Sequence, residues 1–146
     1  MTSAELFTKI QRVIPASRER VFKAWVDPEK LKQWWGPEGV KCLDAEVDLT
    51  VGGTYRLTLL GKSRVPFSVA GSYLEIKEPE RLVFTWDWED EDLRLGHETQ
   101  VKVEFIDQDG STEVIITHSK FPNQEVRDAH EGGWTSLLTK LEAMHS

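Results

Sequence analysis

The feature that most constrains the fold of this chain is a series of strand signals between residues 40 and 119. Short turn sequences, among them Gly52-Gly53 and Glu78-Pro79, divide this region into runs rich in β-branched and aromatic residues. The runs cover 40–49, 53–60, 65–77, 82–88, 97–107 and 111–119. Because antiparallel strands can be joined by short turns, the sequence predicts an antiparallel meander.

The last two strands allow a register prediction, because Asp109-Gly110 is typical of a two-residue type I′ turn. Such a turn fixes every cross-strand partner. The predicted pairs on one face are Phe105 with Val114, Val103 with Ile116, and Val101 with His118. This face is almost entirely apolar, whereas the opposite face is mostly polar. We therefore expect the first face to lie toward the core.

Two other strands differ in how clearly they show an inner face. Alternation in 82–88 places four large apolar groups on one side, namely Leu82, Phe84, Trp86 and Trp88. In 65–77 two apolar sets compete for the inside, Phe67, Val69 and Tyr73 against Ala70, Leu74 and Ile76. A bulge near Gly71 would switch the faces. The inner set of this strand stays open.

The segments before the meander predict one strand and two short helices. The strand covers 6–14 and ends at Pro15. A first helix begins after Ser17, a suitable N-cap, and a second begins at Asp27-Pro28, where proline takes the first helical position. Gly36-Pro37 ends the second helix. The expected buried side chains are Val21, Phe22 and Trp25 in the first helix and Leu31, Trp34 and Trp35 in the second.

The chain ends in a predicted long helix at about 123–145. Its apolar stripe consists of Val126, His130, Trp134, Leu137, Leu138 and Leu141. Gly132-Gly133 interrupts this helix, and each glycine costs about 1 kcal/mol relative to alanine. We therefore expect a kink or the close approach of another backbone at this point.

These elements bury their apolar faces together if the sheet curls around the last helix. The sequence thus predicts an α+β helix-grip fold, with a curved antiparallel sheet of about seven strands wrapped around the C-terminal helix. The chain has 146 residues, of which 39% are hydrophobic, and this length suffices for one core. We expect a single domain over 1–146.

Several segments resemble a known family. They are IPASRERVFKAWVDPEKLKQWWGP, GGTYRL, GSYLEIKEPERLVFTW, VKVEFIDQDGSTEVIITHSKFP and HEGGWTSLLTKLE. In order and over nearly the whole chain, they are similar to the bacterial stand-alone homologues of the activator of the 90-kDa heat-shock protein ATPase. That family is a branch of the START-like or birch-pollen-allergen-like (SRPBCC) superfamily. The resemblance implies a cavity between sheet and helix, which relatives use for apolar ligands. Other branches are cyclases, hydrolases or co-chaperone modules, so the fold alone does not determine the activity.

Composition and motifs argue against several classes of function. The one cysteine, Cys42, rules out an intramolecular disulfide and a multi-cysteine zinc site, and it favours a reducing, cytoplasmic location. The four histidines are far apart, and no phosphate, nucleotide, metallohydrolase or calcium motif occurs. We therefore expect no metal and no cofactor. A net charge of -7 disfavours nucleic acid, and no apolar run approaches the roughly 20 residues that cross a membrane.

His118 and His130 are the candidate polar groups of the cavity. The hairpin register turns His118 inward, and His130 lies on the apolar stripe of the helix that begins a few residues later. Because imidazoles titrate near neutral pH, the pair suggests hydrogen bonds to a ligand carbonyl or general-base catalysis. The alternative is that each is a core histidine satisfied by backbone or water. No nucleophile or carboxylate can be placed beside them, so no catalytic residue is assigned.

Apolar side chains that face the helix complete the predicted cavity wall, and Trp86 and Trp134 are the preferred walls. Most tryptophans at such spacings belong to a core. The candidate lining residues are Trp35, Phe84, Trp86, Val101, Val103, His118, His130, Trp134 and Leu138.

The sequence favours a module that binds a small apolar molecule in this cavity, without covalent chemistry. The first alternative is a co-chaperone or stress-related interaction domain, which would bind a chaperone. The second is a polyketide cyclase-like enzyme acting in the same cavity. Enzymatic activity stays open, with the balance against it. The oligomeric state is expected to be a monomer or a homodimer.

Overall fold

The computed structural model describes residues 6–36, 39–89 and 99–145. Within these ranges the order of elements confirms the predicted one. The elements are β1 (Phe7–Ile14), α1 (Arg18–Val26), α2 (Pro28–Trp34), β2 (Lys41–Val47), β3 (Thr54–Leu60), β4 (Phe67–Lys77), β5 (Arg81–Trp88), β6 (Thr99–Gln108), β7 (Ser111–Ser119) and α3 (Gln124–Met144). The predicted start of the sixth run at residue 97 and the predicted helix end at Pro37 lie outside the described residues.

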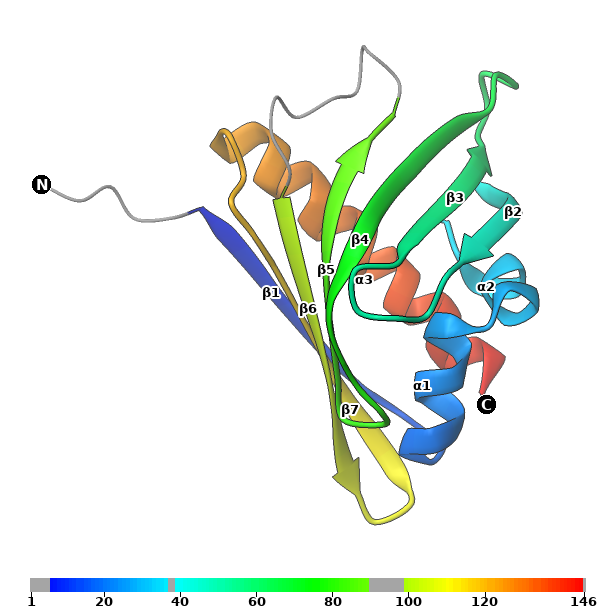
Figure 1. Ribbon diagram of the computed structural model, residues 1–146, viewed down its shortest axis with the longest axis vertical. Coiled ribbons are helices and arrows are strands. Elements are labelled where there is room, and N and C mark those ends of the chain that lie inside the picture. Colours follow the sequence, from blue (N-terminus) through cyan, green and yellow to red (C-terminus); the bar gives the residue numbers. More distant parts are fainter. Residues whose placement is uncertain (1–5, 37–38, 90–98, 146) are drawn as a thin grey trace, which may run out of the picture.

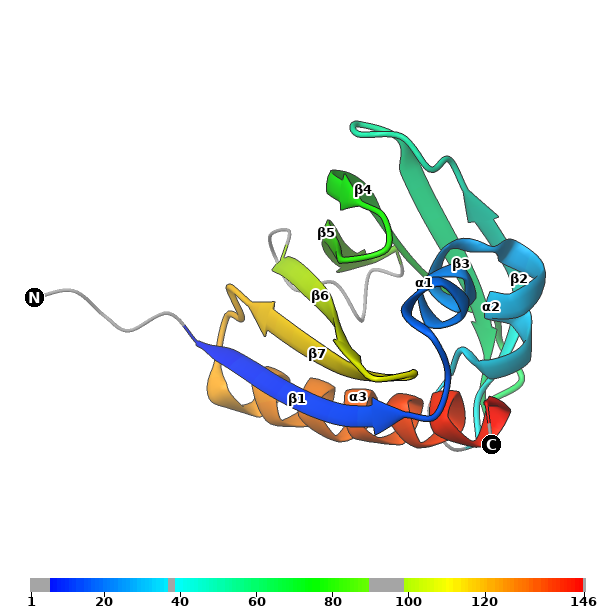
Figure 2. The same ribbon diagram turned by 90° about the horizontal axis from the view of Figure 1, so that it is seen from below.

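The strands form one sheet with the order β1-β7-β6-β5-β4-β3-β2, and all neighbours are antiparallel. Strands β2 to β7 are the predicted meander, and β1 joins its far edge beside β7. The sheet curls so strongly that α3 lies along one side of it and β2 and β3 face α1 and α2 (Figures 1 and 2). This arrangement confirms the helix-grip fold.

The β6–β7 hairpin has the predicted register. Phe105 pairs with Val114, Val103 with Ile116, and Val101 with His118. The turn residues Asp109 and Gly110 both have positive φ, 53° and 95°, as a type I′ turn requires. All six paired side chains are buried. The turn chemistry and the apolar alternation therefore agree, which fixes the inward direction of His118.

Strand β4 contains the irregularity that was predicted near Gly71, a few residues further along the chain. The register shifts between Tyr73 and Glu75, and Leu74 there is 47% exposed. Val69 and Tyr73 lie in the core before the shift, and Ile76 packs against it after the shift. Gly71 has a different role, because a Cβ there would lie 1.9 Å from the carbonyl oxygen of Thr85. Only glycine lets β5 approach β4 this closely.

The helices begin at the predicted caps. The side chain of Ser17 accepts a hydrogen bond from the amide of Arg20, and that of Asp27 accepts one from Glu29. Asn123 caps α3 in the same way, through the amide of Val126. These side chains satisfy amides that the first helical turn leaves without partners.

Helix α3 runs without a break through Gly132 and Gly133. A Cβ on either glycine would meet no atom within 4 Å. The expected close approach of another backbone is therefore wrong. Gly132 is exposed, whereas Gly133 is half-buried. A side chain added at Gly132 would therefore be exposed, whereas one added at Gly133 would enter a partly enclosed space.

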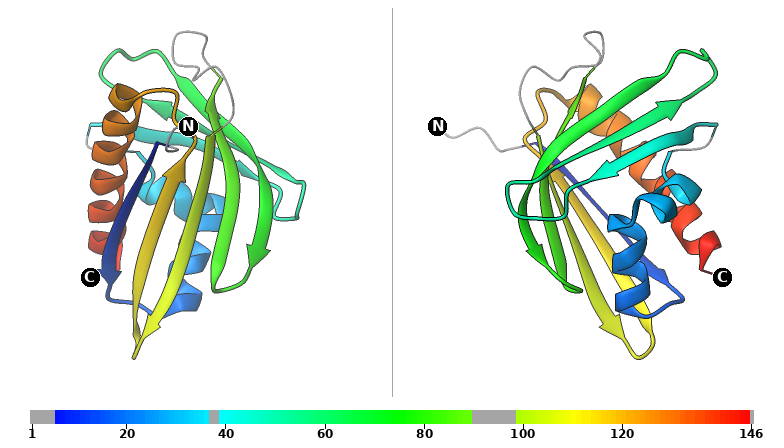
Figure 3. Two further views of the ribbon diagram at one scale, coloured as in Figure 1. Left: turned by 90° about the vertical axis from the view of Figure 1, so that its left-hand side faces the viewer. Right: turned by 45° about the vertical axis from the view of Figure 1, so that its right-hand side comes forward.

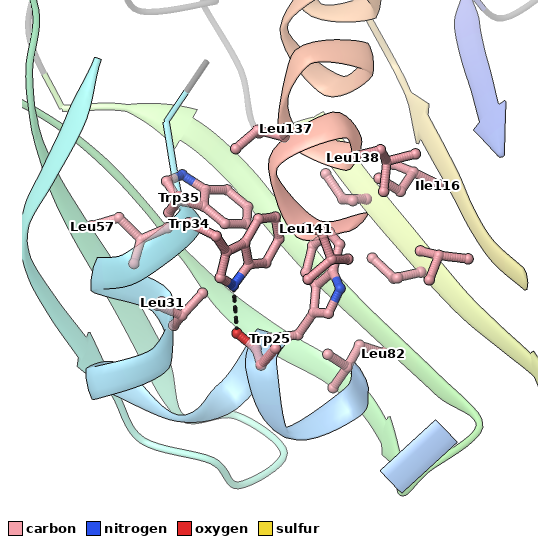
Figure 4. Close-up of a cluster of buried hydrophobic side chains, with 14 of the residues drawn as sticks. Trp25, Leu31, Trp34, Trp35, Leu57, Leu82, Ile116, Leu137, Leu138 and Leu141 are labelled. Atoms are coloured by element: carbon pink, nitrogen blue, oxygen red, sulfur yellow. Dashed lines mark hydrogen bonds between the residues drawn. The ribbon is translucent and has the colours of Figure 1, made fainter. Parts of the chain in front are cut away.

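The two short helices fill one end of the space inside the curved sheet (Figure 3). Phe22 of α1 packs edge-to-face on Phe105 of β6, with ring centroids 5.3 Å apart. Trp34 of α2 donates a hydrogen bond from Nε1 to the carbonyl oxygen of Ala24, at 2.8 Å, which ties α2 to α1. Figure 4 shows this bond beside the leucines of α3. The side chains of α1 and α2 therefore belong to the core at this end of the curved sheet.

Candidate functional site

A cleft of about 280 Å³ lies between α3 and the ends of three strands. The strands contribute the end of β3, the start of β4 and the end of β5. We call this space the aromatic cleft, and its lining residues are Trp35, Leu59, Phe67, Trp86, Trp88, Ala129, His130, Gly133, Trp134 and Leu137. Six of these ten residues carry an aromatic ring, and none is an acidic residue, a lysine or an arginine.

The secondary structure explains why these side chains meet. Alternation along β5 puts Trp86 and Trp88 on the same face, and their ring centroids lie 5.5 Å apart. Helical spacing puts Ala129, Gly133 and Leu137 on one side of α3. Gly133 contributes no side chain, so its position leaves room in the wall.

Trp35 closes the cleft toward α2. It is the C-cap of α2, and its ring packs against Trp86 and Trp134 with centroid distances of 6.1 and 5.6 Å. Figure 4 shows it facing Leu137 of α3. The preceding Trp34 is anchored to α1, so the position of Trp35 follows from how α1 and α2 pack.

A chain of hydrogen bonds runs behind the cleft wall. The indole Nε1 of Trp134 donates to Nδ1 of His118 at 3.0 Å. Because an indole N–H can only donate, Nδ1 carries no proton and Nε2 must carry it. Nε2 of His118 therefore donates to Oγ1 of Thr99 at 2.7 Å, and that hydroxyl donates to the carbonyl oxygen of Trp86 at 2.8 Å. The chain links two walls of the cleft, one on α3 and one on β5.

His118 is neutral in this environment. Burial, together with a smaller effect of the nearby His130, lowers its pKa to about 2. A group with so low a pKa does not take up a proton at neutral pH. Both of its nitrogens are bonded to protein groups, so His118 has the properties of the core histidine that the sequence allowed as an alternative.

His130 lies at the cleft itself and is also fully bonded. Its Nδ1 donates to the carbonyl oxygen of Val126 at 2.9 Å, and its Nε2 accepts from Nε1 of Trp88 at 3.3 Å. Burial lowers its pKa, although the hydrogen bond to Val126 opposes this shift. The ring centroids of His118 and His130 are 5.2 Å apart. The two imidazoles therefore meet as predicted, but neither has the basicity of a free histidine.

A second, smaller cavity of about 20 Å³ lies on the other side of Trp35. Its lining residues are Trp25, Leu31, Trp35, Val47, Tyr55, Leu57, Tyr73, Leu82 and Phe84. This volume holds about one water molecule. Burial raises the pKa of the Tyr73 hydroxyl there, so it stays protonated. The aromatic cleft is therefore the space of the two that has the size of a small ligand.

The nine predicted lining residues occupy different places. Four line the aromatic cleft, namely Trp35, Trp86, His130 and Trp134, and Phe84 lines the smaller cavity. The other four, Val101, Val103, His118 and Leu138, are at most 1% exposed and belong to the interior behind the cleft. Val101 and Val103 face inward but are completely buried, and α1 packs on the same strand.

Sequence reasoning missed six lining residues: Leu59, Phe67, Trp88, Ala129, Gly133 and Leu137. The signal for Trp88 was its alternation with Trp86. That for Gly133 and Leu137 was their helical spacing from His130. Leu59 and Phe67 depend on how far the sheet curls, which strand periodicity does not determine.

In the described ranges, no group of three histidine, cysteine, aspartate or glutamate residues is placed to hold a metal ion. No helix of the described chain has the length and apolarity needed to cross a bilayer.

Comparison with known proteins agrees with this geometry. The chain is 31% identical to the AHSA1 protein of Silicibacter pomeroyi, whose crystal structure superimposes with a TM-score of 0.83 over 95% of this chain and 96% of that one. Protein CV1439 of Chromobacterium violaceum is 27% identical, with the same TM-score of 0.83 and coverage of 95% and 96%. No curated protein matches the chain. Residues 15–146 match the family described as "Activator of Hsp90 ATPase homolog 1-like protein", and the chain belongs to this family.

Proposed function

We propose that this protein binds a small, largely apolar molecule in the aromatic cleft. The observation that carries the proposal is the composition of the wall, in which the described residues contribute six rings and no acidic, lysine or arginine side chain around about 280 Å³. Apolar pockets of roughly 300–1,000 Å³ are where proteins usually bind small ligands. Burial of apolar ligand surface contributes about 25 cal/mol per Å².

The same geometry argues against acid–base chemistry by the two histidines. A general base works best when its pKa is near the operating pH. Burial moves the pKa of both His118 and His130 downward, away from that range. Their hydrogen-bond partners are tryptophan, threonine and backbone groups rather than a nucleophile or a carboxylate. A binding role therefore accounts for the site better than the cyclase-like alternative does.

The proposal is tested by titrating the protein with N-phenyl-1-naphthylamine, a neutral dye whose fluorescence rises in apolar surroundings. We expect saturable binding to the wild-type protein. Gly133→Leu places a side chain in the cleft, where a Cβ has no atom within 4 Å, and should weaken binding about tenfold or more.

Gly132→Leu is the matched control, because Gly132 is the neighbouring residue and is exposed. It should leave the dye affinity within about twofold, since its side chain points away from the ligand. Circular dichroism establishes that both variants are folded. Non-saturable binding to the wild type, or equal effects of the two variants, would contradict the proposed site.

A further inference from the structure

The polar groups of the aromatic cleft are mostly used within the protein. The N–H of Trp134 is bonded to His118, and the N–H of Trp88 is bonded to His130. The remaining nitrogen of His130 is bonded to the backbone of Val126. A ligand that needs several hydrogen bonds or a counter-ion would therefore find few partners on these residues.

Trp86 is different. Its Nε1 is buried, and no acceptor for it exists in the part of the chain that the structure describes. Buried donors are nearly always paired in native proteins, so an unpaired one calls for an explanation, and a bound ligand with an acceptor would provide one. Trp25 carries a second unpaired N–H, but it borders the smaller cavity, which has room for only about one water. Of the two, only Trp86 borders a space large enough for a ligand.

The backbone and the ring of Trp86 are held by different kinds of contact. Thr99 donates to the carbonyl oxygen of Trp86, which fixes the strand at this point. The ring itself makes no hydrogen bond to any described residue and contacts other rings, the nearest being Trp134 with a centroid distance of 5.1 Å. A ligand acceptor that reaches this N–H would therefore displace no hydrogen bond between described residues.

Building on the proposed function, we propose that the ligand is a neutral, flat ring molecule of about two fused rings with one hydrogen-bond acceptor, which accepts from Nε1 of Trp86. The cleft volume of about 280 Å³ sets the size, because an apolar cavity of roughly 150 Å³ holds benzene. No acidic, lysine or arginine side chain from the described part of the chain lines the cleft. This sets the charge, because an anionic group would lose its hydration without gaining a partner there. Fatty acids and other carboxylates are thus disfavoured.

Three probes with the same rings separate these features. They are 2-acetylnaphthalene, which has a carbonyl acceptor, 2-ethylnaphthalene, which has none, and 2-naphthoate, which is charged. Calorimetric titration of the wild-type protein should show the acetyl compound binding about fivefold more tightly than the ethyl compound, as one net hydrogen bond predicts. The naphthoate should bind at least about tenfold more weakly than the acetyl compound.

Trp86→Phe keeps a ring and removes the donor, so the advantage of the acetyl over the ethyl compound should disappear. Trp25→Phe is the control, because it removes a buried N–H that also lacks an acceptor among the described residues but borders only the smaller cavity, and it should preserve that advantage. If Trp86→Phe does not fold, the wild-type ¹⁵N–¹H spectrum decides the question. The indole N–H resonance of Trp86 should then move downfield with the acetyl compound and not with the ethyl compound.

The possible failures are distinguishable. Equal affinities for the acetyl and ethyl compounds, with both binding saturably, would overturn the role of Trp86 and leave the proposed function standing. If naphthoate bound most tightly of the three probes, the inference that the ligand is neutral would be wrong. No binding by any probe would overturn both the inference and the proposed function.

Discussion

The pH dependence of folding provides a direct test of the buried state of His118. In the unfolded chain this imidazole has an ordinary pKa of 6.5, whereas burial lowers the pKa in the folded protein to about 2. Between these values the unfolded state binds one proton more than the folded state. The free energy of unfolding therefore falls as the pH falls through 6.5. Above about pH 7.5 both states are neutral and the effect vanishes.

The magnitude follows from the shift. One pKa unit corresponds to about 1.4 kcal/mol. A pH of 5.0 lies 1.5 units below the ordinary pKa of 6.5 that the imidazole has in the unfolded chain. Protonation of the unfolded chain should thus lower the free energy of unfolding by about 2 kcal/mol between pH 7.5 and pH 5.0. This result holds for any folded pKa well below 5. His130 adds a contribution of the same sign, because its pKa is also lowered.

Urea denaturation at pH 7.5 and pH 5.0 measures this change. His118→Asn is the comparison, because asparagine does not titrate and its side-chain oxygen can still accept from Trp134. The variant should be less stable than the wild type at pH 7.5 and should lose about 2 kcal/mol less of its stability on acidification. A wild-type free energy of unfolding that stays constant over this range, or an identical loss in the variant, would refute a neutral, buried His118.

Two further predictions concern α3. Gly132→Ala and Gly133→Ala should each raise the free energy of unfolding by about 1 kcal/mol in urea denaturation, because alanine favours the helix and neither Cβ meets another atom; a loss of stability in either variant would mean that a neighbour packs on the glycine after all. Trp134→Phe keeps an aromatic ring but leaves Nδ1 of His118 without its donor, so it should cost about 1–3 kcal/mol in the same assay. This loss in the free energy of unfolding should nearly vanish in the His118→Phe background. A double-mutant cycle without coupling would show that this hydrogen bond does not form.

The fold was largely predictable because its signals are local. The Asp109-Gly110 turn fixed the register of the hairpin, and the caps Ser17 and Asp27 marked where two helices begin. The face switch in β4 was less accessible. Its exact position at Leu74 depends on how β5 pairs with β4. The prediction was centred on Gly71, which instead allows the close approach of Thr85.

The candidate site was only partly predictable because a cleft is what packing leaves unfilled. Periodicity indicated which side chains face inward, and Trp86, His130 and Trp134 do line the cleft. It could not indicate that α1 covers β6, which encloses Val103 in the core. The hydrogen-bond partners of His118 could not be predicted either, because they come from β6 and α3.

The indole N–H groups provide the most direct test of ligand binding in the aromatic cleft. The chain has six tryptophans, of which Trp35, Trp86, Trp88 and Trp134 line the cleft, while Trp25 and Trp34 do not. A ¹⁵N–¹H spectrum recorded during titration with 2-ethylnaphthalene reports on all six at once. The account predicts saturable shifts that are largest for the four lining indoles. Unchanged resonances, or shifts confined to Trp25 and Trp34, would contradict it.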